Sequence, residues 1–248
     1  MLVDAHCHLD FKDFDKDRDE VVKRAKDMII INSIVDPDDA EKGFQIARRY
    51  ENVYCTLGLS PAQTDDIKFE KTLELIKKHK DEIVGIGEVG LDYYWVKELE
   101  VRKKQMEHFS KFIKISTDIG KPLILHTRDA EQECMDTIAE KKVTALMHCF
   151  SGTVQQALNA VEAGCIISIP TNVTYVKARQ KLAEAIPLES MVLETDAPYL
   201  SPQKGNRNEP SNIAAAAKKI AELKGENTST VEDTTSENAL RFYNIENG

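Results

Sequence analysis

Short apolar runs alternate with longer amphipathic segments along the whole chain. The runs have the length and composition of buried β-strands, and their starts lie roughly 20–40 residues apart. That spacing leaves room for one crossover helix between consecutive strands, as parallel pairing requires. The eight runs cover residues 2–6, 28–35, 53–59, 83–87, 122–126, 143–148, 165–170 and 191–196.

The segments between the runs carry helix start and stop signals. Apolar side chains recur along one side of residues 100–119 before Gly120, and along residues 153–163 before Gly164, which predicts two helices ended by glycine. Asp36-Pro37 predicts a helix start with proline at the first position. Near the C-terminus two capping-box patterns predict two short closing helices, at Ser229 with Glu232 and at Thr234 with Glu237.

Eight strands alternating with helices favour an α/β fold, a TIM-type (β/α)8 barrel that forms one domain over residues 1–248. A doubly wound open sheet is the alternative. It usually carries a glycine-rich turn after its first strand, and this sequence has none. The chain is 42% hydrophobic and 30% charged, as in ordinary globular proteins with a substantial core.

Charge and cysteine content limit the possible partners and location. The formal net charge of −9 means that a nucleic acid or other phosphodiester would have to be held by a local cationic centre. We expect no membrane span, because no run of about eighteen apolar residues occurs. We expect no secretory signal, because the N-terminus lacks a basic region followed by an apolar stretch and a cleavage site. Five cysteines without a C-x-x-C pair are typical of reduced thiols, so we expect a cytoplasmic protein. No obligatory protein partner is evident.

Side chains that bind metals follow five of the predicted strands. His6 and His8 are separated by one residue, so they point to the same side of an extended strand. The carboxyl ends of barrel strands converge at one mouth, where active sites of this fold lie. Six ligands from distant positions are therefore expected to meet there: His6, His8, Glu88, His126, His148 and Asp196.

Four histidines and two carboxylates exceed the needs of one tetrahedral ion that keeps an open position. The surplus predicts two divalent ions, which activate water and clamp a phosphoryl group. Glu88, the only carboxylate at the end of a middle strand, is the predicted bridge between them. Asp196 is expected to bind metal and to accept the proton of the attacking water.

Alternation along the strands also predicts the surroundings of the site. Asp4 lies two residues before His6, and Glu194 lies two residues before Asp196, so each acid points to the same face of its strand as the ligand. Both acids are therefore expected just below the metals, where they would orient histidines. The alternative is a pair of buried acids that serve only strand geometry. We expect no ligand role for His79 or His108, the first on a solvated helix end and the second off the apolar side of its helix. Cys149 is expected to pack against helices, away from the site.

Two arginines are candidates for binding phosphate, because the guanidinium fork suits phosphate oxygens. Arg128 follows His126 where the chain leaves its strand, although a salt bridge to a neighbour such as Asp129 is an equal alternative. Arg207 lies with Gly205 in the loop after the last strand, and loops at that end of a barrel commonly hold phosphate.

These residues together resemble the TatD family of metal-dependent deoxyribonucleases, within the amidohydrolase-like superfamily of TIM barrels. The resemblance implies that the six residues named above are metal ligands, and that the ions are magnesium, manganese or zinc. It also implies hydrolysis of phosphodiester bonds in DNA, often from a 3′ end. The matching motifs are Asp4-Ala-His-Cys-His-Leu-Asp10, Ile86-Gly-Glu-Val-Gly-Leu-Asp-Tyr93, Pro122-Leu-Ile-Leu-His-Thr-Arg-Asp-Ala130, His148-Cys-Phe-Ser-Gly152, Glu194-Thr-Asp-Ala-Pro-Tyr199, Arg207-Asn-Glu-Pro210 and Glu237-Asn-Ala-Leu-Arg-Phe242.

The loop after the third strand departs from the family pattern. Many relatives carry Gly-x-His-Pro-His there, whereas this chain reads Gly58-Leu-Ser-Pro-Ala62. The alternatives are an amidohydrolase-type enzyme acting on amides or lactones and a catalytically silent metal-binding barrel. Many dinuclear amidohydrolases bridge their metals with a carboxylated lysine on the fourth strand. Glu88 stands at that place here and favours phosphodiester hydrolysis.

Overall fold

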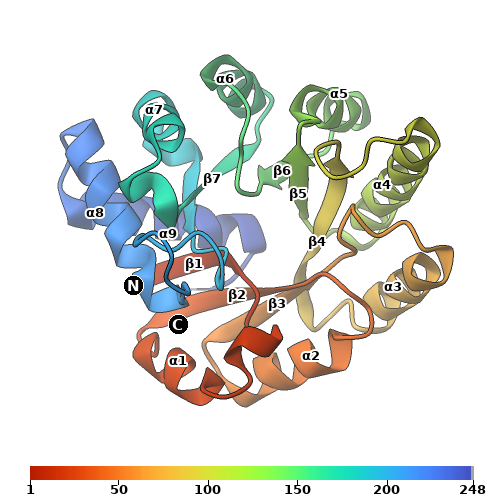
Figure 1. Cartoon of the computed structure of the whole chain (residues 1–248), viewed down its shortest axis with the longest axis horizontal. Coiled ribbons are helices and arrows are strands. Elements are labelled where there is room, and N and C mark those ends of the chain that lie inside the picture. The colour runs from red at the N-terminus through yellow and green to blue at the C-terminus, as the bar shows by residue number, and fades with distance from the viewer. Residues whose placement is uncertain (247–248) are drawn as a thin grey trace.

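Eight parallel strands pair in chain order, and helices surround them (Figure 1). The computed structural model describes residues 1–246. The strands are β1 (Leu2–Cys7), β2 (Met28–Ile34), β3 (Val53–Leu57), β4 (Ile83–Asp92), β5 (Leu123–Arg128), β6 (Ala145–Met147), β7 (Ile166–Pro170) and β8 (Met191–Glu194). The α-helices are α1 (Arg18–Arg24), α2 (Ala40–Arg49), α3 (Asp66–Lys78), α4 (Leu99–Ile119), α5 (Glu131–Lys141), α6 (Val154–Glu162), α7 (Lys177–Ala185), α8 (Ile213–Lys224) and α9 (Thr228–Tyr243).

The first and last strands meet and nearly close the barrel. The backbone N–H of Asp196 donates to the carbonyl oxygen of His6 at 2.9 Å, and the N–H of His8 donates to that of Ala197 at 2.8 Å. These bonds bring the two ends of the sheet together, so the chain forms a TIM-type barrel and not an open sheet. Each of the eight predicted runs overlaps one strand, and β1, β4 and β5 extend past their predicted ends, to Cys7, Asp92 and Arg128.

Local sequence signals account for several helix ends. Gly120 ends α4 with φ of 66°, a left-handed conformation that glycine adopts without a steric penalty. Thr153 and Gln156 form a reciprocal capping box at the start of α6. The helix predicted at Asp36-Pro37 is misplaced, because α2 begins only at Ala40. The side chain of Asp36 instead accepts the N–H of Asp38 in a turn.

The prediction of two short closing helices is wrong. Ser229 and Thr234 both lie inside the single helix α9, which begins after Asn227. A hydroxyl inside a helix can bond the carbonyl four residues earlier, as Thr235 does with Val231 at 2.7 Å. Short Ser/Thr–Glu patterns therefore arise within a continuous helix as well as at its start.

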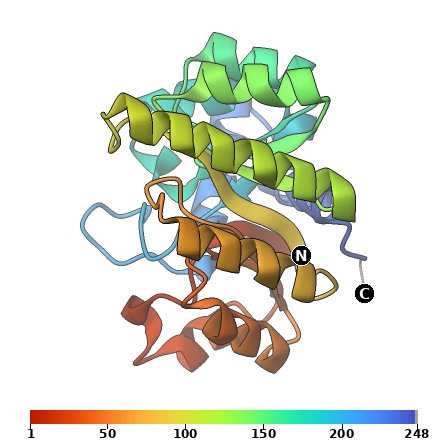
Figure 2. The ribbon, with the colours of Figure 1, turned by 90° about the vertical axis from the view of Figure 1, so that its right-hand side faces the viewer.

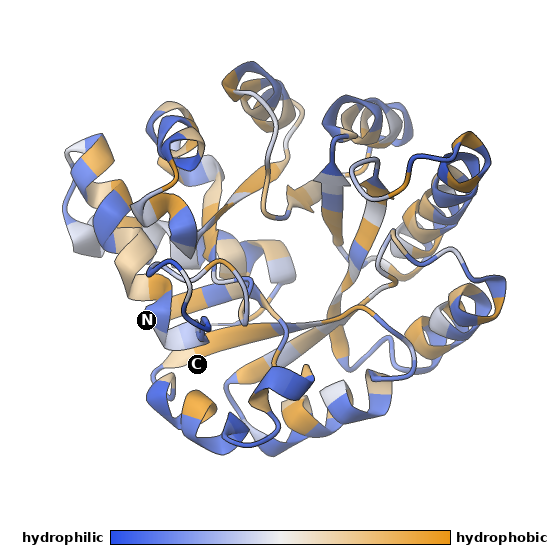
Figure 3. Cartoon of the chain, viewed as in Figure 1, coloured by the Kyte–Doolittle hydropathy of each residue, from blue (hydrophilic) through white to orange (hydrophobic). Residues whose placement is uncertain are grey.

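The apolar core has two parts. A large cluster fills the space between the strands and the helices that lie outside them (Figure 2). The strands and the inner helix faces carry most of the apolar residues (Figure 3). A smaller cluster joins Val3, Ile29 and Ile31 to Leu240 and Tyr243 of α9. The Tyr243 hydroxyl donates to the carbonyl of Ala5 at 2.9 Å, so α9 covers the amino end of the barrel. The carboxyl end is left for the loops.

Among residues 1–246, no helix combines the length and the apolar character needed to cross a membrane.

Candidate metal centre

Six predicted ligand side chains meet at the carboxyl end of the strands. Glu88 lies at the centre, with Oε2 at 3.6 Å from Nε2 of His6 and at 4.0 Å from Nε2 of both His8 and His148. Oδ1 of Asp196 lies 3.8, 3.4 and 3.9 Å from the same three nitrogens. Three groups of donor atoms each fit within 4.8 Å: His6, His8 and Glu88; Glu88, His126 and His148; and His6, His148 and Asp196.

Strand β2 orients His6 of β1 and His8, which follows β1. The Nδ1–H of His8 donates to the carbonyl oxygen of Ser33 at 2.8 Å, so its Nε2 faces the centre. The Ser33 hydroxyl bonds Nδ1 of His6 at 3.0 Å and accepts from Thr56 at 3.2 Å. Ser33 is not among the site residues predicted from the sequence. The signal for it is the polar pair Asn32-Ser33 inside an otherwise apolar strand.

His126 is held between two carboxylates. Its Nδ1 lies 2.6 Å from Oε1 of Glu88, and its Nε2 lies 2.8 Å from Oδ2 of Asp92. Asp92 belongs to the motif Ile86–Tyr93 but is not among the site residues predicted from the sequence. Its position four residues after Glu88 in the same strand is the signal that would have found it.

The last strand and the turn after it position Glu194 and the predicted ligand Asp196. Glu194 is fully buried, and its Oε2 accepts the Nδ1–H of His148 at 2.8 Å. Asp196 has φ of 54°, a left-handed conformation that Asp and Asn tolerate better than most side chains. This turn after β8 directs the Asp196 carboxylate toward the histidines.

Burial and charge together set the protonation of the central groups. Burial and the neighbouring His148 and His8 lower the pKa of His6 well below its usual value, which keeps the imidazole neutral and able to bind metal. Burial favours the neutral form of Glu88, but His148 and His126 outweigh it and hold the pKa of Glu88 well below its usual value. Glu88, the predicted bridge, is therefore a carboxylate.

The expectation for Asp4 differs from the structure. The pairing of β1 with β2 shifts register between Asp4 and Cys7, so side-chain alternation is interrupted before His6. Oδ1 of Asp4 accepts the N–H of Thr195 at 2.8 Å, and Oδ2 accepts its hydroxyl at 2.5 Å. Asp4 thus joins β1 to β8, as in the alternative that gave it only a geometric role. Burial raises its pKa to about 8.

Three other side chains also differ in their surroundings from the sequence prediction. His79 is buried against Phe44 at a ring separation of 4.3 Å, and His108 is buried against Phe69 at 3.8 Å. Neither is the solvated side chain that the sequence predicted. Cys149 turns into a left-handed conformation after β6, and its sulfur joins a donor group with His148 and Glu194. The sulfur also accepts from Arg179 of α7 at 3.2 Å, so Cys149 contacts a helix as predicted while lying beside His148 and Glu194.

The two candidate arginines occupy different environments. Arg128 ends β5 next to His126 and is exposed, with its guanidinium carbon 3.9 Å from the centroid of the Tyr94 ring. Arg207 pairs with Asp17 through two bonds of 2.8 and 2.5 Å, and it also donates to the Asp13 carbonyl. Arg207 thus ties the loop after β8 to the start of α1.

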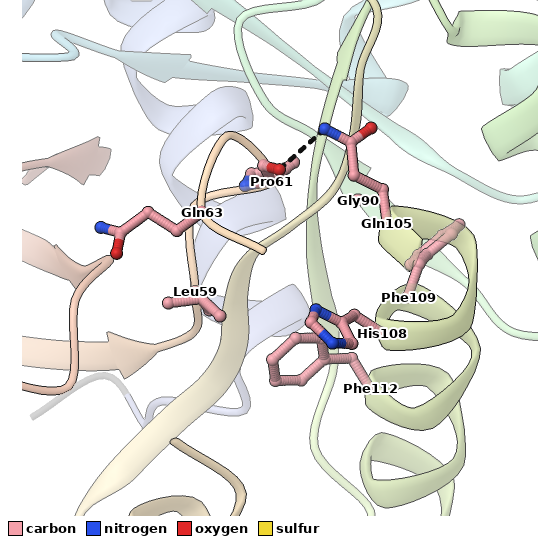
Figure 4. A pocket seen from close by; sticks show the side chains of 8 residues that line it. All are labelled: Leu59, Pro61, Gln63, Gly90, Gln105, His108, Phe109 and Phe112. Carbon is pink, nitrogen blue, oxygen red and sulfur yellow. Dashed lines mark hydrogen bonds between the residues drawn. The ribbon is translucent and has the colours of Figure 1, made fainter. Parts of the chain in front are cut away.

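The loop that replaces the family's histidine-bearing segment is fixed by backbone contacts. The Ser60 N–H donates to the carbonyl of Val35 at 3.0 Å, and the Gln105 amide of α4 donates to the carbonyl of Pro61 at 2.8 Å (Figure 4). A small cavity lies beneath the loop, lined by Leu59 and His108 among others. The loop is therefore anchored, and it carries no imidazole toward the metal centre.

Comparisons with known proteins agree with this geometry. Residues 3–244 match the family described as TatD related DNase. An uncharacterized metal-dependent hydrolase of Methanocaldococcus jannaschii is 40% identical over 97% of this chain and 96% of its own. The Homo sapiens protein named deoxyribonuclease TATDN3 is 33% identical over 98% of this chain and 94% of its own. The crystal structure of a TatD homologue from Escherichia coli has a TM-score of 0.89 at 25% identity, covering 99% of this chain and 98% of the other. This chain therefore belongs to the TatD-related DNase family and is a metal-dependent hydrolase.

Proposed function

We propose that this chain hydrolyses phosphodiester bonds of DNA with two divalent metal ions, removing nucleotides from a 3′ end. The observation that carries the proposal is the position of Glu88. It belongs to two separate three-residue donor groups, one with His6 and His8 and the other with His126 and His148. A carboxylate shared in this way is the arrangement that two adjacent cations require.

The donor set fits zinc, manganese or magnesium. Imidazole nitrogen suits zinc, and carboxylate oxygen suits magnesium and manganese. Two bound ions would lower the pKa of water and stabilise the attacking and leaving oxygens of a phosphoryl transfer. His6, His8, His126 and His148 would hold these ions, together with Glu88 and Asp196.

Proton transfer and phosphate binding would depend on Asp196, Arg128 and Arg207. Asp196 would accept the proton from the attacking water, because its Oδ1 lies among three histidine nitrogens at the open end of the barrel. Arg128 would bind a non-bridging phosphate oxygen beside His126. Arg207 would bind phosphate only after giving up its bonds to Asp17.

Degradation of single-stranded and double-stranded DNA with added Mg²⁺, Mn²⁺ or Zn²⁺ tests the proposal. Asp196→Asn should lower turnover by about 100-fold or more, since general acid–base groups contribute about 10²–10⁴. Asn tolerates the left-handed backbone of this position, so the variant should keep the wild-type circular dichroism spectrum. Asp136→Asn, an exposed acid on α5, is the matched control.

Two results would overturn this assignment. One is an Asp196→Asn variant with unchanged turnover. The other is a wild-type enzyme that degrades no DNA with any of the three metals but turns over lactones or N-acyl substrates. Labelling the strand at either end separates removal of 3′ nucleotides from internal cleavage.

A further inference from the structure

Two large aromatic side chains are exposed on the loop between β4 and α4. Tyr94 is 43% exposed and Trp95 is 67% exposed. Their rings meet edge to face, with centroids 4.9 Å apart and an interplanar angle of 87°. The guanidinium carbon of Arg128 lies 3.9 Å from the Tyr94 centroid and 5.6 Å from that of Trp95. We call Tyr94, Trp95 and Arg128 the aromatic cluster.

Asp92 connects the aromatic cluster to the candidate metal centre by hydrogen bonds. The N–H of Trp95 donates to Oδ1 of Asp92 at 2.8 Å, and Oδ2 of Asp92 contacts Nε2 of His126 at 2.8 Å. Arg128 lies two residues after His126 on β5, opposite Asp92 in the register of β4 with β5. The cluster therefore lies on the rim of the barrel, beside the ligand His126.

The loop is ordered by its own contacts. The N–H of Tyr93 donates to the carbonyl of Arg128 at 2.9 Å, and the hydroxyl of Tyr93 donates to Glu133 at 2.8 Å. Arg102 donates to the carbonyls of Val96 and Tyr93 at 2.9 and 3.1 Å. These bonds hold the exposed rings in place without covering them, so little conformational entropy would be lost on binding.

Cationic side chains lie against the rings of this loop, among acidic neighbours such as Glu98 and Glu133, in a chain whose net charge is −9. Nζ of Lys97 lies 5.5 Å from the Tyr94 centroid, and Arg102 stacks on Tyr93 at 4.2 Å. Exposed rings among cations are the features that bind a single nucleic-acid strand, because bases stack on aromatic faces while the phosphates meet positive charge.

We propose that the aromatic cluster is a base-stacking subsite for an unpaired base of the strand whose phosphate lies at the metal centre. This inference rests on the proposed function. Trp95 and Tyr94 provide the apolar faces. Stacking uses the flat face of the Arg128 guanidinium, which leaves its N–H edge for a phosphate. A base within a duplex has both faces covered by its neighbours, so the subsite favours single strands.

Trp95 is the only tryptophan of the chain, so its fluorescence reports on the subsite directly. The full-length protein with Mg²⁺ is titrated with a short phosphorothioate oligothymidylate, and in parallel with the same backbone carrying abasic sugars. Quenching by the base-containing strand, with much weaker quenching by the abasic strand, is the expected result. Equal quenching by both strands, or quenching by neither, would overturn the inference.

Kinetics provide the second test. Trp95→Ala should raise KM for single-stranded DNA by roughly 5- to 150-fold, the value of one base–aromatic stack, and leave KM for the abasic strand unchanged. Trp95→Phe keeps a ring and should retain most of the binding. Leu99→Ala removes a side chain that is 71% exposed but has no ring, and it should behave as wild type.

The outcomes separate the two proposals. One outcome is that the wild type cleaves both the base-containing and the abasic strand while Trp95→Ala has the same KM values as wild type. In that case the phosphodiesterase function stands and the stacking subsite is refuted. An enzyme that cleaves neither strand refutes the proposed function. The fluorescence titration then decides the stacking subsite alone.

Discussion

Nδ1 of His148 lies 2.8 Å from Oε2 of Glu194, and the Glu194 side chain is completely buried. A carboxylate only accepts, so this contact places the proton of His148 on Nδ1 and turns Nε2 toward Glu88 and Asp196. Glu194 therefore determines which nitrogen of His148 faces the candidate metal centre.

Glu194→Gln should weaken metal binding by about 10- to 100-fold, the usual effect of removing an orienting partner of a metal-binding histidine. The measurement is competition with a chelator of known affinity. Glu189→Gln, an exposed acid just before β8, is the matched control. Unchanged affinity in Glu194→Gln, with wild-type resistance to denaturant, would contradict this role.

Gly58→Ala should displace the carboxylate of Glu88, the predicted bridge, by shifting its backbone. A Cβ atom at residue 58 would lie 2.4 Å from the carbonyl oxygen of Glu88, so the backbone of β4 must shift. A displacement of about 1 Å can lower turnover by about 100-fold.

Gly120→Ala is the control variant for Gly58→Ala. Gly120 has open space around its Cβ position but φ of +66°. Gly120→Ala should therefore lower stability by about 1–2 kcal/mol and leave turnover unchanged. Denaturant unfolding and turnover are measured on both variants. Wild-type turnover in Gly58→Ala would show that β3 does not constrain the bridge.

Removing metal should lower the thermal stability of the protein. Bound metal stabilises the folded chain by about 2.7 kcal/mol at a free concentration of 100 times Kd. A chelator should therefore lower the Tm of wild type. It should have a smaller effect on a His6→Ala, His8→Ala double variant, because one of the two donor groups that contain Glu88 then keeps only the carboxylate. An equal shift in both proteins would show that the chelator acts elsewhere.

The pair of Arg207 with Asp17 should make stability depend on acid pH. The hydrogen bonds from Arg207 hold the pKa of Asp17 below its ordinary value. A lowered folded pKa stabilises the protein above the unfolded pKa, about 3.9, and this contribution is lost as the pH falls through the folded pKa.

Asp17→Asn should therefore be less stable than wild type at neutral pH, and the difference in the free energy of unfolding should shrink below about pH 4. Asp27→Asn, an exposed acid at the turn before β2, serves as the control. A difference that stays constant between neutral and acid pH would refute this account. The same variant frees Arg207, so an accompanying fall in KM for DNA would support the proposed phosphate contact.

Local patterns predicted most of the fold correctly. The alternation of apolar runs with amphipathic segments predicted eight strands, and strand and helix periodicity depend only on neighbouring residues. Gly120 and Thr153 marked helix ends correctly for the same reason. The capping boxes at Ser229 and Thr234 misled because the packing of α9 against the barrel, a tertiary contact, favours one continuous helix.

The chain by itself determined which side chains are available as ligands and which strand ends carry them. Only the tertiary structure decided how they are held. It places Asp92 beside His126 and Ser33 beside His6, and it pairs Arg207 with Asp17. The register shift in β1 moves Asp4 out of the alternation that predicted its role. Such contacts join residues far apart in sequence and depend on strand register and loop path, which periodicity along the chain does not encode.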